Sequence, residues 1–355
     1  IVKATVKITD GLMTPEALYS FGRISEAVVS PDKSKILYGV TYVSIEQNKT
    51  NRELFTMNID GSDNKQITKT PTGENSAVWV KNGSKIASSE GGSSQIWEMN
   101  PDGSDRVKIS DVEGGVNGFS YSPDEKKILY IKNVKFGERT SDIYPDLPKA
   151  SGRIIDDLMY KHWSEWIEEI PHSFVADYDG SKLSNDRDIL EGEPYECPML
   201  PFGGIEQLAW SPDSKTIAYT CRKKTGMAYA LSTNSDIYLY EIDSKKTSNI
   251  TDGMMGYDIN PVFSPDGKYI AWQSMERDGY ESDKNRLFVM NLATGDKTYV
   301  TEDFDYNTDF IQWNNDNQSL YIISCVEAKT QIFKAYIHTK EIKPVTEGVH
   351  DYESF

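Results

Sequence analysis

Short runs of apolar residues alternate with polar turns along this chain, and one ten-residue pattern of them recurs. It reads VSPDKSKILY at 29–38, YSPDEKKILY at 121–130, WSPDSKTIAY at 210–219 and FSPDGKYIAW at 263–272. In each copy, the end of an apolar strand precedes a turn that contains Pro and Asp, and a second apolar strand follows. The pattern predicts repeated pairs of antiparallel strands joined by a tight turn.

The repeat occurs six times when the copies are aligned on the apolar residue four positions after the turn residue. These apolar residues are Ile36, Ile86, Ile128, Ile217, Ile270 and Leu320. Two further strands follow in each copy, and one interval between copies is much longer than the others. A repeat of this length with four short strands is typical of a propeller blade, because each blade buries its faces against its neighbours. We therefore predict an all-β fold, a β-propeller of four-stranded blades with a helical insertion in the third blade.

The two ends of the chain are expected to differ from the regular blades. Residues 348–355, GVHDYESF, resemble the inner strand of a further blade, so six repeats are visible and we expect seven blades when the ring is complete. Residues 1–25 are expected to form an N-terminal extension with a short helix, because Thr14 is a suitable N-cap and Pro15 suits the first helical position. The propeller itself is expected to span residues 26–355.

The helical insertion is predicted at about residues 134–172. Its segment 153–170, RIIDDLMYKHWSEWIEEI, has apolar residues at 155, 159, 163, 166/167 and 170, which is a helical period. That period would place Glu165, Glu168 and Glu169 together on the opposite face. Two interpretations stay open: a solvated acidic face, and a binding site for an ammonium group among mutually repelling carboxylates.

The connections between the second and third strands vary most among the copies. They lie at 44–52, about 134–172, 223–235 and 276–286. Because binding residues concentrate on variable loops of a rigid scaffold, we expect these loops to form the functional face. In the last of them, Arg277, Glu276 and Tyr280 are candidates to contact substrate or another domain. The alternative is a salt-bridged surface loop.

Composition narrows the choice of ligand. The chain has 38 Lys and Arg against 55 Asp and Glu, a formal net charge of -17. This charge disfavours nucleic acid and anionic membrane surfaces and favours a cationic ligand. No apolar run approaches the roughly 20 residues of a membrane-spanning helix, so no membrane span is expected.

No metal or cofactor is predicted. The acid-rich turns at 60–65 and 102–106 lack the ligand order of a calcium loop and are interpreted as hairpin turns. The three cysteines, Cys197, Cys221 and Cys325, have no metal-ligand spacing and are too few for a disulfide framework. One bridge with one free thiol stays open for an oxidising compartment.

Longer stretches of the chain resemble a known family. They are LMTPEALYSFGRISEAVVSPD near the start, KHWSEWIEEI in the insertion, and the runs at 192–219 and 256–292. Together they resemble the N-terminal propeller of prolyl-oligopeptidase-family serine peptidases, in the branch of the bacterial dipeptidyl-peptidase 5 and acylaminoacyl-peptidase-like enzymes. The resemblance covers nearly the whole chain. The SPDG turns alone are a weaker signal, because TolB-type propellers share them.

The resemblance implies a C-terminal α/β-hydrolase domain with Ser, Asp and His, and this chain lacks it. The nearest approach to a nucleophile elbow, GFSYS at 118–122, lacks the second Gly and lies in a blade strand. No catalytic residue is therefore predicted in this chain, and it is expected not to hydrolyse peptides by itself. Its expected role is to gate the active site and to anchor the amino terminus of the peptide.

The resemblance also suggests residues for that anchor. In relatives that remove dipeptides, a pair of glutamates on an inserted helix holds the free amino group. This makes Glu168 and Glu169 the candidates, with Glu165 in support. A peptide α-amino group, with a pKa of about 8, is mostly protonated at neutral pH and can donate three hydrogen bonds to carboxylates.

The expected partners are a peptide with a free or acylated amino terminus and the missing hydrolase domain, and a homodimer is a further candidate. A periplasmic or exported location follows from the resemblance alone. The alternative function is a stand-alone TolB-like propeller that serves as a protein-binding scaffold. An enzyme with chemistry in its own channel is disfavoured, because the inner strands are apolar.

Overall fold

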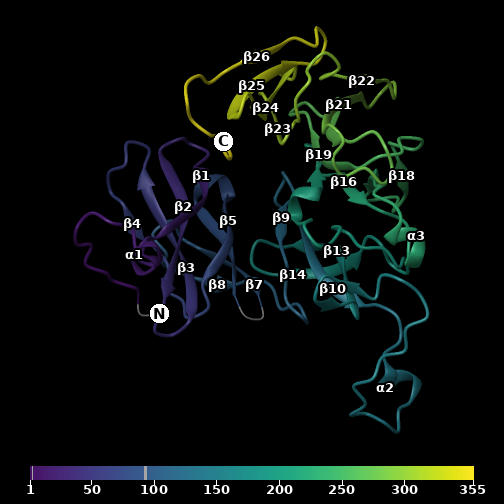
Figure 1. Cartoon of the computed structure of the whole chain (residues 1–355), viewed down its shortest axis with the longest axis horizontal. Coiled ribbons are helices and arrows are strands. Elements are labelled where there is room, and N and C mark those ends of the chain that lie inside the picture. The colour runs from purple at the N-terminus through teal and green to yellow at the C-terminus, as the bar shows by residue number, and fades with distance from the viewer. Residues whose placement is uncertain (2, 92–93) are drawn as a thin grey trace. The chain divides into compact units, whose positions relative to one another are not determined.

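In the part of the chain that the structure describes, six antiparallel sheets of four strands each form the blades of an all-β propeller, as the six repeats predicted (Figure 1). The computed structural model describes residues 1, 3–91 and 94–355. These residues form two compact units. The first unit comprises 1–121, 125–132 and 175–186, and the second comprises 122–124, 133–174 and 187–355.

The first two blades follow one another in the first unit. The first blade has the strands β1 (Arg23–Val29), β2 (Lys35–Ser44), β3 (Lys49–Asn58) and β4 (Lys65–Gln66). The second blade has the strands β5 (Glu74–Val80), β6 (Lys85–Glu90), β7 (Gln95–Met99) and β8 (Val107–Lys108). A hydrophobic core joins them, formed by Leu37, Leu54, Ala77, Ile86 and Met99. The alternation of apolar residues along each strand therefore serves contact between blades.

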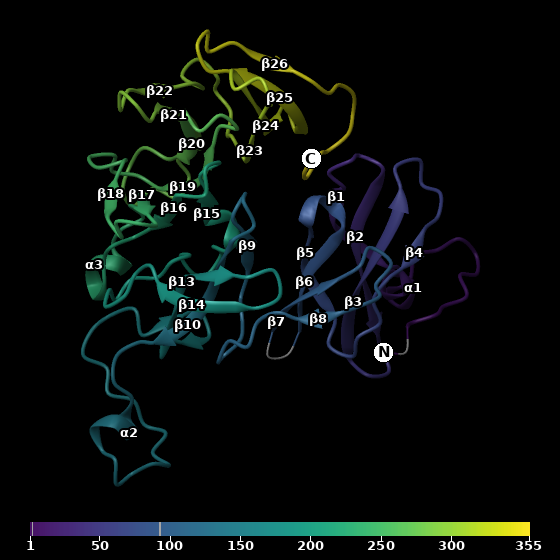
Figure 2. The same ribbon diagram turned by 180° about the vertical axis from the view of Figure 1, so that it is seen from behind.

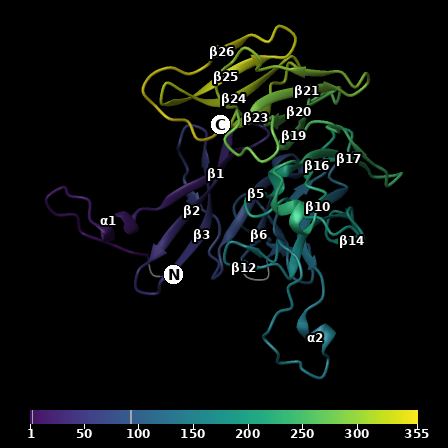
Figure 3. The same cartoon turned by 45° about the vertical axis from the view of Figure 1, so that its right-hand side comes forward.

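The third blade is interrupted between its second and third strands. It has β9 (Phe119–Tyr121), β10 (Lys127–Lys135), β13 (Glu169–Tyr178) and β14 (Leu183–Asp188). A two-stranded hairpin of β11 (Lys161–His162) and β12 (Glu165–Trp166) lies in the interruption. The segment that carries α2 (Thr140–Ile143) extends away from the sheets of the second unit (Figure 3).

Three regular blades follow in the second unit (Figure 2). The fourth has β15 (Leu208–Trp210), β16 (Thr216–Cys221), β17 (Asp236–Glu241) and β18 (Thr247–Asn249). The fifth has β19 (Asp258–Phe263), β20 (Tyr269–Ser274), β21 (Arg286–Asn291) and β22 (Lys297–Tyr299). The sixth has β23 (Phe310–Trp313), β24 (Ser319–Val326), β25 (Lys329–Tyr336) and β26 (Ile342–Pro344).

Helices are few and short in the described residues. Besides α2 they are α1 (Pro15–Ser20), α3 (Gly226–Ala230) and the 3₁₀ turns η1 (Lys81–Gly83) and η2 (Ile205–Gln207). The predicted cap of α1 is confirmed, because the Thr14 hydroxyl accepts a hydrogen bond from the backbone N–H of Ala17 at 3.2 Å.

The recurring Ser-Pro-Asp turn is held by its own side chains. In the fifth blade, the hydroxyl of Ser264 donates to Asp266 Oδ1 at 2.7 Å and accepts from the backbone N–H of Tyr269 at 2.9 Å. The backbone N–H of Lys268 also donates to Asp266, at 3.1 Å. The first and fourth blades repeat this geometry. The turn recurs in the sequence because these residue types satisfy it locally.

A tryptophan hydrogen bond links neighbouring blades. The indole Nε1 of Trp79, on β5, donates to the carbonyl of Val28 on β1 at 3.1 Å. In the second unit Trp313, on β23, donates in the same way to Val262 on β19 at 3.0 Å. The inner strands β5 and β23 thus each satisfy a backbone acceptor of the blade before them.

The helix predicted for 153–170 is wrong. Residues 161–166 form the hairpin β11–β12, and Met159 and Trp163 have positive φ angles of 58° and 48°, which a right-handed helix does not allow. Spacings of three and four residues in an aromatic-rich segment do not exclude a hairpin. In the hairpin, the ring centre of Trp166 lies 4.1 Å from the Arg153 guanidinium and 4.3 Å from the Lys161 ammonium group.

Two smaller expectations also change. The connection predicted as a long loop at 44–52 is mostly strand, because β2 and β3 pair continuously from Lys35 to Ser44. Residues 348–355 form no strand, and Phe355 packs edge-on against Phe310 of the sixth blade with ring centroids 5.0 Å apart. The expectation of seven blades in a longer chain stays a prediction.

Candidate functional site

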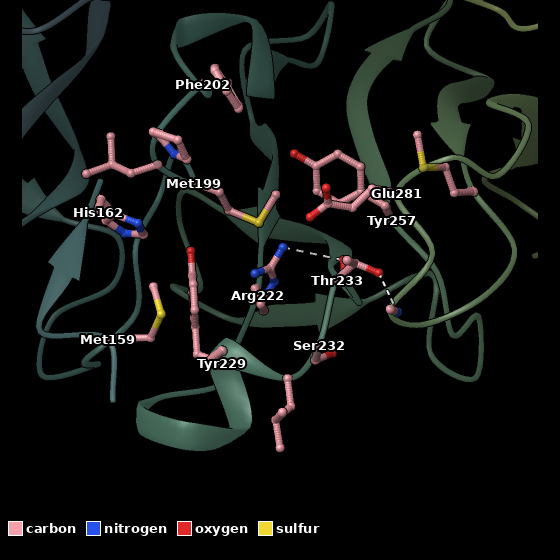
Figure 4. A pocket seen from close by; sticks show the side chains of 16 residues that line it. Met159, His162, Met199, Phe202, Arg222, Tyr229, Ser232, Thr233, Tyr257 and Glu281 are labelled. Atoms are coloured by element: carbon pink, nitrogen blue, oxygen red, sulfur yellow. Dashed lines mark hydrogen bonds between the residues drawn. The ribbon is translucent and has the colours of Figure 1, made fainter. Parts of the chain in front are cut away.

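A cavity of about 500 Å³ opens among loops of the second unit (Figure 4). The insertion contributes Met159 and His162, and the connection before the fourth blade contributes residues 199–202. The β16–β17 and β20–β21 connections of the fourth and fifth blades contribute most of the remaining lining, and Tyr257 immediately precedes β19. Three of the variable connections between second and third strands therefore meet at one cavity, as the functional-face prediction requires for this unit.

A buried glutamate ties three of these segments together. Glu196 lies in the connection before the fourth blade and is 6% exposed. Its Oε1 lies 2.7 Å from His162 Nε2 of the insertion hairpin, and its Oε2 accepts from the phenol of Tyr229 in α3 at 2.7 Å. Burial, and then the Glu196 carboxylate, raise the pKa of Tyr229. The network fixes the hairpin and α3 as two walls of the cavity.

Arg222 brings a positive charge to the cavity from the residue after β16. Its guanidinium lies 4.5 Å from the centre of the Tyr229 ring, and one terminal nitrogen donates to the carbonyl of Thr233 at 3.5 Å. The buried Nε of Arg222 has no hydrogen-bond partner. Across residues 1, 3–91 and 94–355, no carboxylate lies within ion-pair distance of this guanidinium. Arg222 is thus held in place while its charge stays uncompensated.

Glu281 and Tyr257 lie on the side of the cavity toward the fifth blade (Figure 4). Burial raises the pKa of Tyr257; the positive charge of Arg222 opposes this rise, and the carboxylates of Glu206 and Glu281 add to it. Glu281 is exposed and has no ion-pair partner in the described part of the chain. The cavity therefore holds one cationic and one anionic side chain at separate places.

The predicted glutamates lie outside the lining of this cavity. Glu165, on β12, is exposed. Glu168 pairs with Arg153 at 3.0 Å and with Arg139 at 3.4 Å, and Glu169 pairs with Arg139 at 3.2 Å. Glu168 lines a second cavity, of about 270 Å³, in the insertion. Because no helix forms, the three carboxylates do not share a helix face, and two of them already have cationic partners.

The candidates in the β20–β21 loop belong to local ion pairs. The guanidinium of Arg277 pairs with Asp283 and lies 3.9 Å from the ring centre of Tyr280, while Glu276 lies 3.8 Å from Arg286. None of the three candidates is among the lining residues of the 500 Å³ cavity, although their loop reaches it through Glu281. This arrangement agrees with the alternative of a salt-bridged surface loop, and a role in binding stays a prediction.

Sequence reasoning missed Glu196, Arg222 and Tyr229. The partners of Glu196, His162 and Tyr229, lie 34 and 33 residues away in the sequence. The partners of Arg222 lie in the loop that follows it, at irregular spacing. No short motif marks either residue. The only available signal was indirect: the connection between the third and fourth blades is long, and the loop at 223–235 was already identified as variable. Both contribute to the cavity.

Other kinds of site find no support in the residues that the structure describes. No group of three or more His, Cys, Asp or Glu could hold a metal ion there, and no described helix is long and apolar enough to cross a membrane. The three cysteines are free thiols. Burial raises the pKa of Cys197 to about 12, so this thiol is a poor nucleophile.

Comparisons with known proteins place these observations in a family. A family model described as the TolB beta propeller domain matches residues 175–354. The dipeptidyl-peptidase 5 of Porphyromonas gingivalis is 55% identical over 345 residues, which are 97% of this chain and 50% of that protein. The dipeptidyl-peptidase 5 of Porphyromonas endodontalis is 44% identical over 346 residues, which are 97% of this chain and 50% of that protein.

Among solved structures, the uncomplexed acylaminoacyl peptidase of Pyrococcus horikoshii matches with a TM-score of 0.68 and 16% identity. The match covers 93% of this chain and 47% of that one, and at this identity it shows a shared fold. The chain spans about half the length of the curated relatives it matches.

Proposed function

Because the chain belongs to the TolB β-propeller domain family, we propose that it is the non-catalytic propeller of a serine exopeptidase of the dipeptidyl-peptidase or acylaminoacyl-peptidase type. The observation that carries the proposal is the 55% identity to a dipeptidyl-peptidase 5 over 97% of the chain. Such a propeller would be joined to an α/β-hydrolase domain, which would supply the Ser, Asp and His residues. The peptide substrate would have a free or acylated amino terminus.

In this proposal the propeller gates access to the hydrolase and anchors the amino terminus of the peptide. The gating role is supported by the convergence of three variable connections on a cavity whose volume is ordinary for a small-ligand site. Glu168 and Glu169 are retained as anchor candidates, supported by their position on the insertion. An ammonium group would take the place of Arg139, which bridges the two carboxylates.

The second candidate is a stand-alone propeller that binds proteins as a scaffold. Large apolar side chains at the surface of the second unit favour it, above all Trp163 and Phe202, which are 76% and 77% exposed. The gene separates the two candidates. A strand, a G-x-S-x-G motif and a helix encoded beyond codon 355 support the peptidase, and a stop codon supports the scaffold.

The anchor role is tested in the protein that contains the hydrolase half. Dipeptide release is compared between peptides with a free amino terminus and the same peptides with an acetyl group. Glu168→Gln together with Glu169→Gln should lower cleavage of free peptides about tenfold, because a charge-assisted contact is lost, and should spare acetylated ones.

Glu302→Gln is the matched control, because it removes an exposed carboxylate that also pairs with a cation, Lys340. It should leave both substrates unaffected. An equal effect of the double variant on free and acetylated peptides would reject the anchor. A hydrolase half that shows the same preference without the propeller would reject gating.

A further inference from the structure

Arg222 and Glu281 give the 500 Å³ cavity two opposite charges, and neither has an ion-pair partner in the described part of the chain. Their side chains line the same cavity and are not paired with each other, since no ion pair between them lies within 4.0 Å. A cavity with separated charges of opposite sign is suited to a ligand that carries both charges.

We propose that this cavity binds short peptides as zwitterions, with the carboxylate at Arg222 and the ammonium group at Glu281. The inference deepens the proposed function and rests on it, because short free peptides are what a dipeptidyl peptidase releases. It differs from that function in one respect: the propeller chain alone should bind them, without any hydrolase domain.

The carboxylate end of the proposed site depends on how Arg222 is held. The ring of Tyr229 covers the guanidinium, and the Thr233 carbonyl accepts from one of its nitrogens, so the planar group is already ordered before a ligand arrives. Thr233 is itself fixed, since its hydroxyl accepts from the backbone N–H of Gly279 at 2.8 Å. In the described part of the chain, the other N–H donors of Arg222 have no acceptor. An ordered guanidinium with free donors binds a carboxylate with little entropic cost.

The ammonium end lies toward the fifth blade. Glu281 is exposed at this side, and Glu206 is a second exposed carboxylate close enough to act on Tyr257. The Glu206 carboxylate already accepts from the backbone N–H of Gly204 at 2.7 Å, whereas Glu281 has no such contact. Glu281 is thus the carboxylate that is free to receive an ammonium group.

Part of the cavity lining is apolar. Phe202 and Leu231 line the cavity although they are 77% and 72% exposed, and Met199 and Met275 add flexible side chains. Exposed apolar side chains beside a cavity gain burial when a ligand covers them, and methionines adapt to different shapes. We therefore expect peptides with apolar side chains to bind better than polar ones.

Calorimetric titration of the 355-residue chain with the dipeptide Leu-Phe, its N-acetyl form and its C-terminal amide tests the proposal without any mutation. The amide should bind about tenfold more weakly, because a charge-assisted contact to a half-buried guanidinium is lost. The acetylated form should bind about threefold more weakly, because Glu281 is exposed and its attraction is screened. Equal affinity for the three forms, or no binding of any, would overturn the proposal.

Two variants assign each charge to its residue. The Arg222→Gln variant should bind the amide and the free dipeptide equally. The Glu281→Gln variant should bind the acetylated and the free dipeptide equally. The matched controls are Arg23→Gln, which removes an exposed arginine that also lies over a tyrosine ring, and Glu302→Gln. The control variants should keep the differences in affinity between the three forms of the dipeptide. A control that loses these differences would reject the assignment. Circular dichroism confirms that each variant is folded.

The two hypotheses fail separately. Cleavage by the longer protein together with no dipeptide binding by this chain would overturn only this inference. Dipeptide binding together with a stop codon at the end of this chain would overturn the peptidase function and leave a peptide-binding scaffold.

Discussion

The two ends of the fifth blade treat their acids in opposite ways. At the turn end, desolvation alone would raise the pKa of Asp266, but hydrogen bonds from Ser264 and from the backbone of Lys268 outweigh it and lower the pKa. At the loop end, burial raises the pKa of Asp258 to about 7, although the indole of Trp272 donates to this carboxyl at 3.0 Å. Both acids belong to the same blade, yet only Asp266 is stabilised in its charged form.

The difference is one of distance along the sequence. The partners of Asp266 lie two residues away on either side, so a five-residue segment is sufficient to build the turn and to repeat it. The groups at the loop end find partners far along the chain, as Glu196 does with His162 and Tyr229, or find none, as Glu281 does. Groups of the first kind form the scaffold, and groups of the second kind are available to form a site.

The largest expected effect concerns Asp258. Its pKa is near 7 in the folded chain and near 3.8 when unfolded, so between about pH 4 and 7 the folded state keeps a proton that the unfolded state releases. Stability from this group is therefore present at low pH and is lost as the pH rises through 7, by up to about 4 kcal/mol. Asp258→Asn should remove this loss, as measured by urea unfolding at pH 4.5 and 7.5.

Asp266→Asn serves as the comparison at the turn end. It should change the pH dependence of stability in the opposite direction. Because the folded pKa of Asp266 is lowered, its contribution is present above the unfolded pKa and is lost as the pH falls. If Asp258→Asn kept the same change of stability with pH as the wild type, the two ends of the blade would not differ as described.

A smaller effect is expected at the buried glutamate. Glu196→Ala leaves His162 and the phenol of Tyr229 without their acceptor, and breaking a buried polar network of this kind costs about 3 kcal/mol. Urea unfolding at pH 7 measures the loss. The nearby Glu193 pairs with Lys223 at a more exposed position, so Glu193→Ala should cost less than about 1 kcal/mol. Similar costs for the two variants would contradict the proposed importance of the network.

The smallest expected effect is at the turn. Asp266→Ala removes one hydroxyl and one backbone hydrogen bond from an exposed turn and should cost about 1 kcal/mol. Dipeptide binding should be unchanged. Asp252→Ala, at another exposed aspartate, is the control and should be neutral within about 0.5 kcal/mol. A changed dipeptide affinity in Asp266→Ala would show that the turn end and the loop end are not independent.

Much of the fold could be predicted because its signals are local. The Ser-Pro-Asp turns and the apolar strands around Ile128, Ile217 and Ile270 repeat at blade length, and each copy forms a four-stranded sheet. The insertion could not be predicted in the same way. Its apolar spacing suits a helix, but Trp163 adopts a positive φ and Trp166 packs against cations, and neither feature is visible in a periodic pattern.

The candidate site was predicted as a region and not as residues. The variable loops at 223–235 and 276–286 do line the cavity, because variable loops on a regular scaffold mark a binding face. The residues that matter most, Arg222 and Glu196, act through contacts that only the folded chain creates. The expected helical spacing and the family resemblance directed attention to Glu168 and Glu169, whose carboxylates already pair with arginines.

The indole donors of Trp79 and Trp313 have a consequence for how the chain loses its structure. Each satisfies a partly buried carbonyl on the inner strand of the preceding blade, so a blade that detached would break a hydrogen bond of its neighbour as well as its apolar contacts. Adjacent blades should therefore melt in pairs rather than singly, and hydrogen exchange of the indole N–H groups of Trp79 and Trp313 should report the separation of each blade from the one before it.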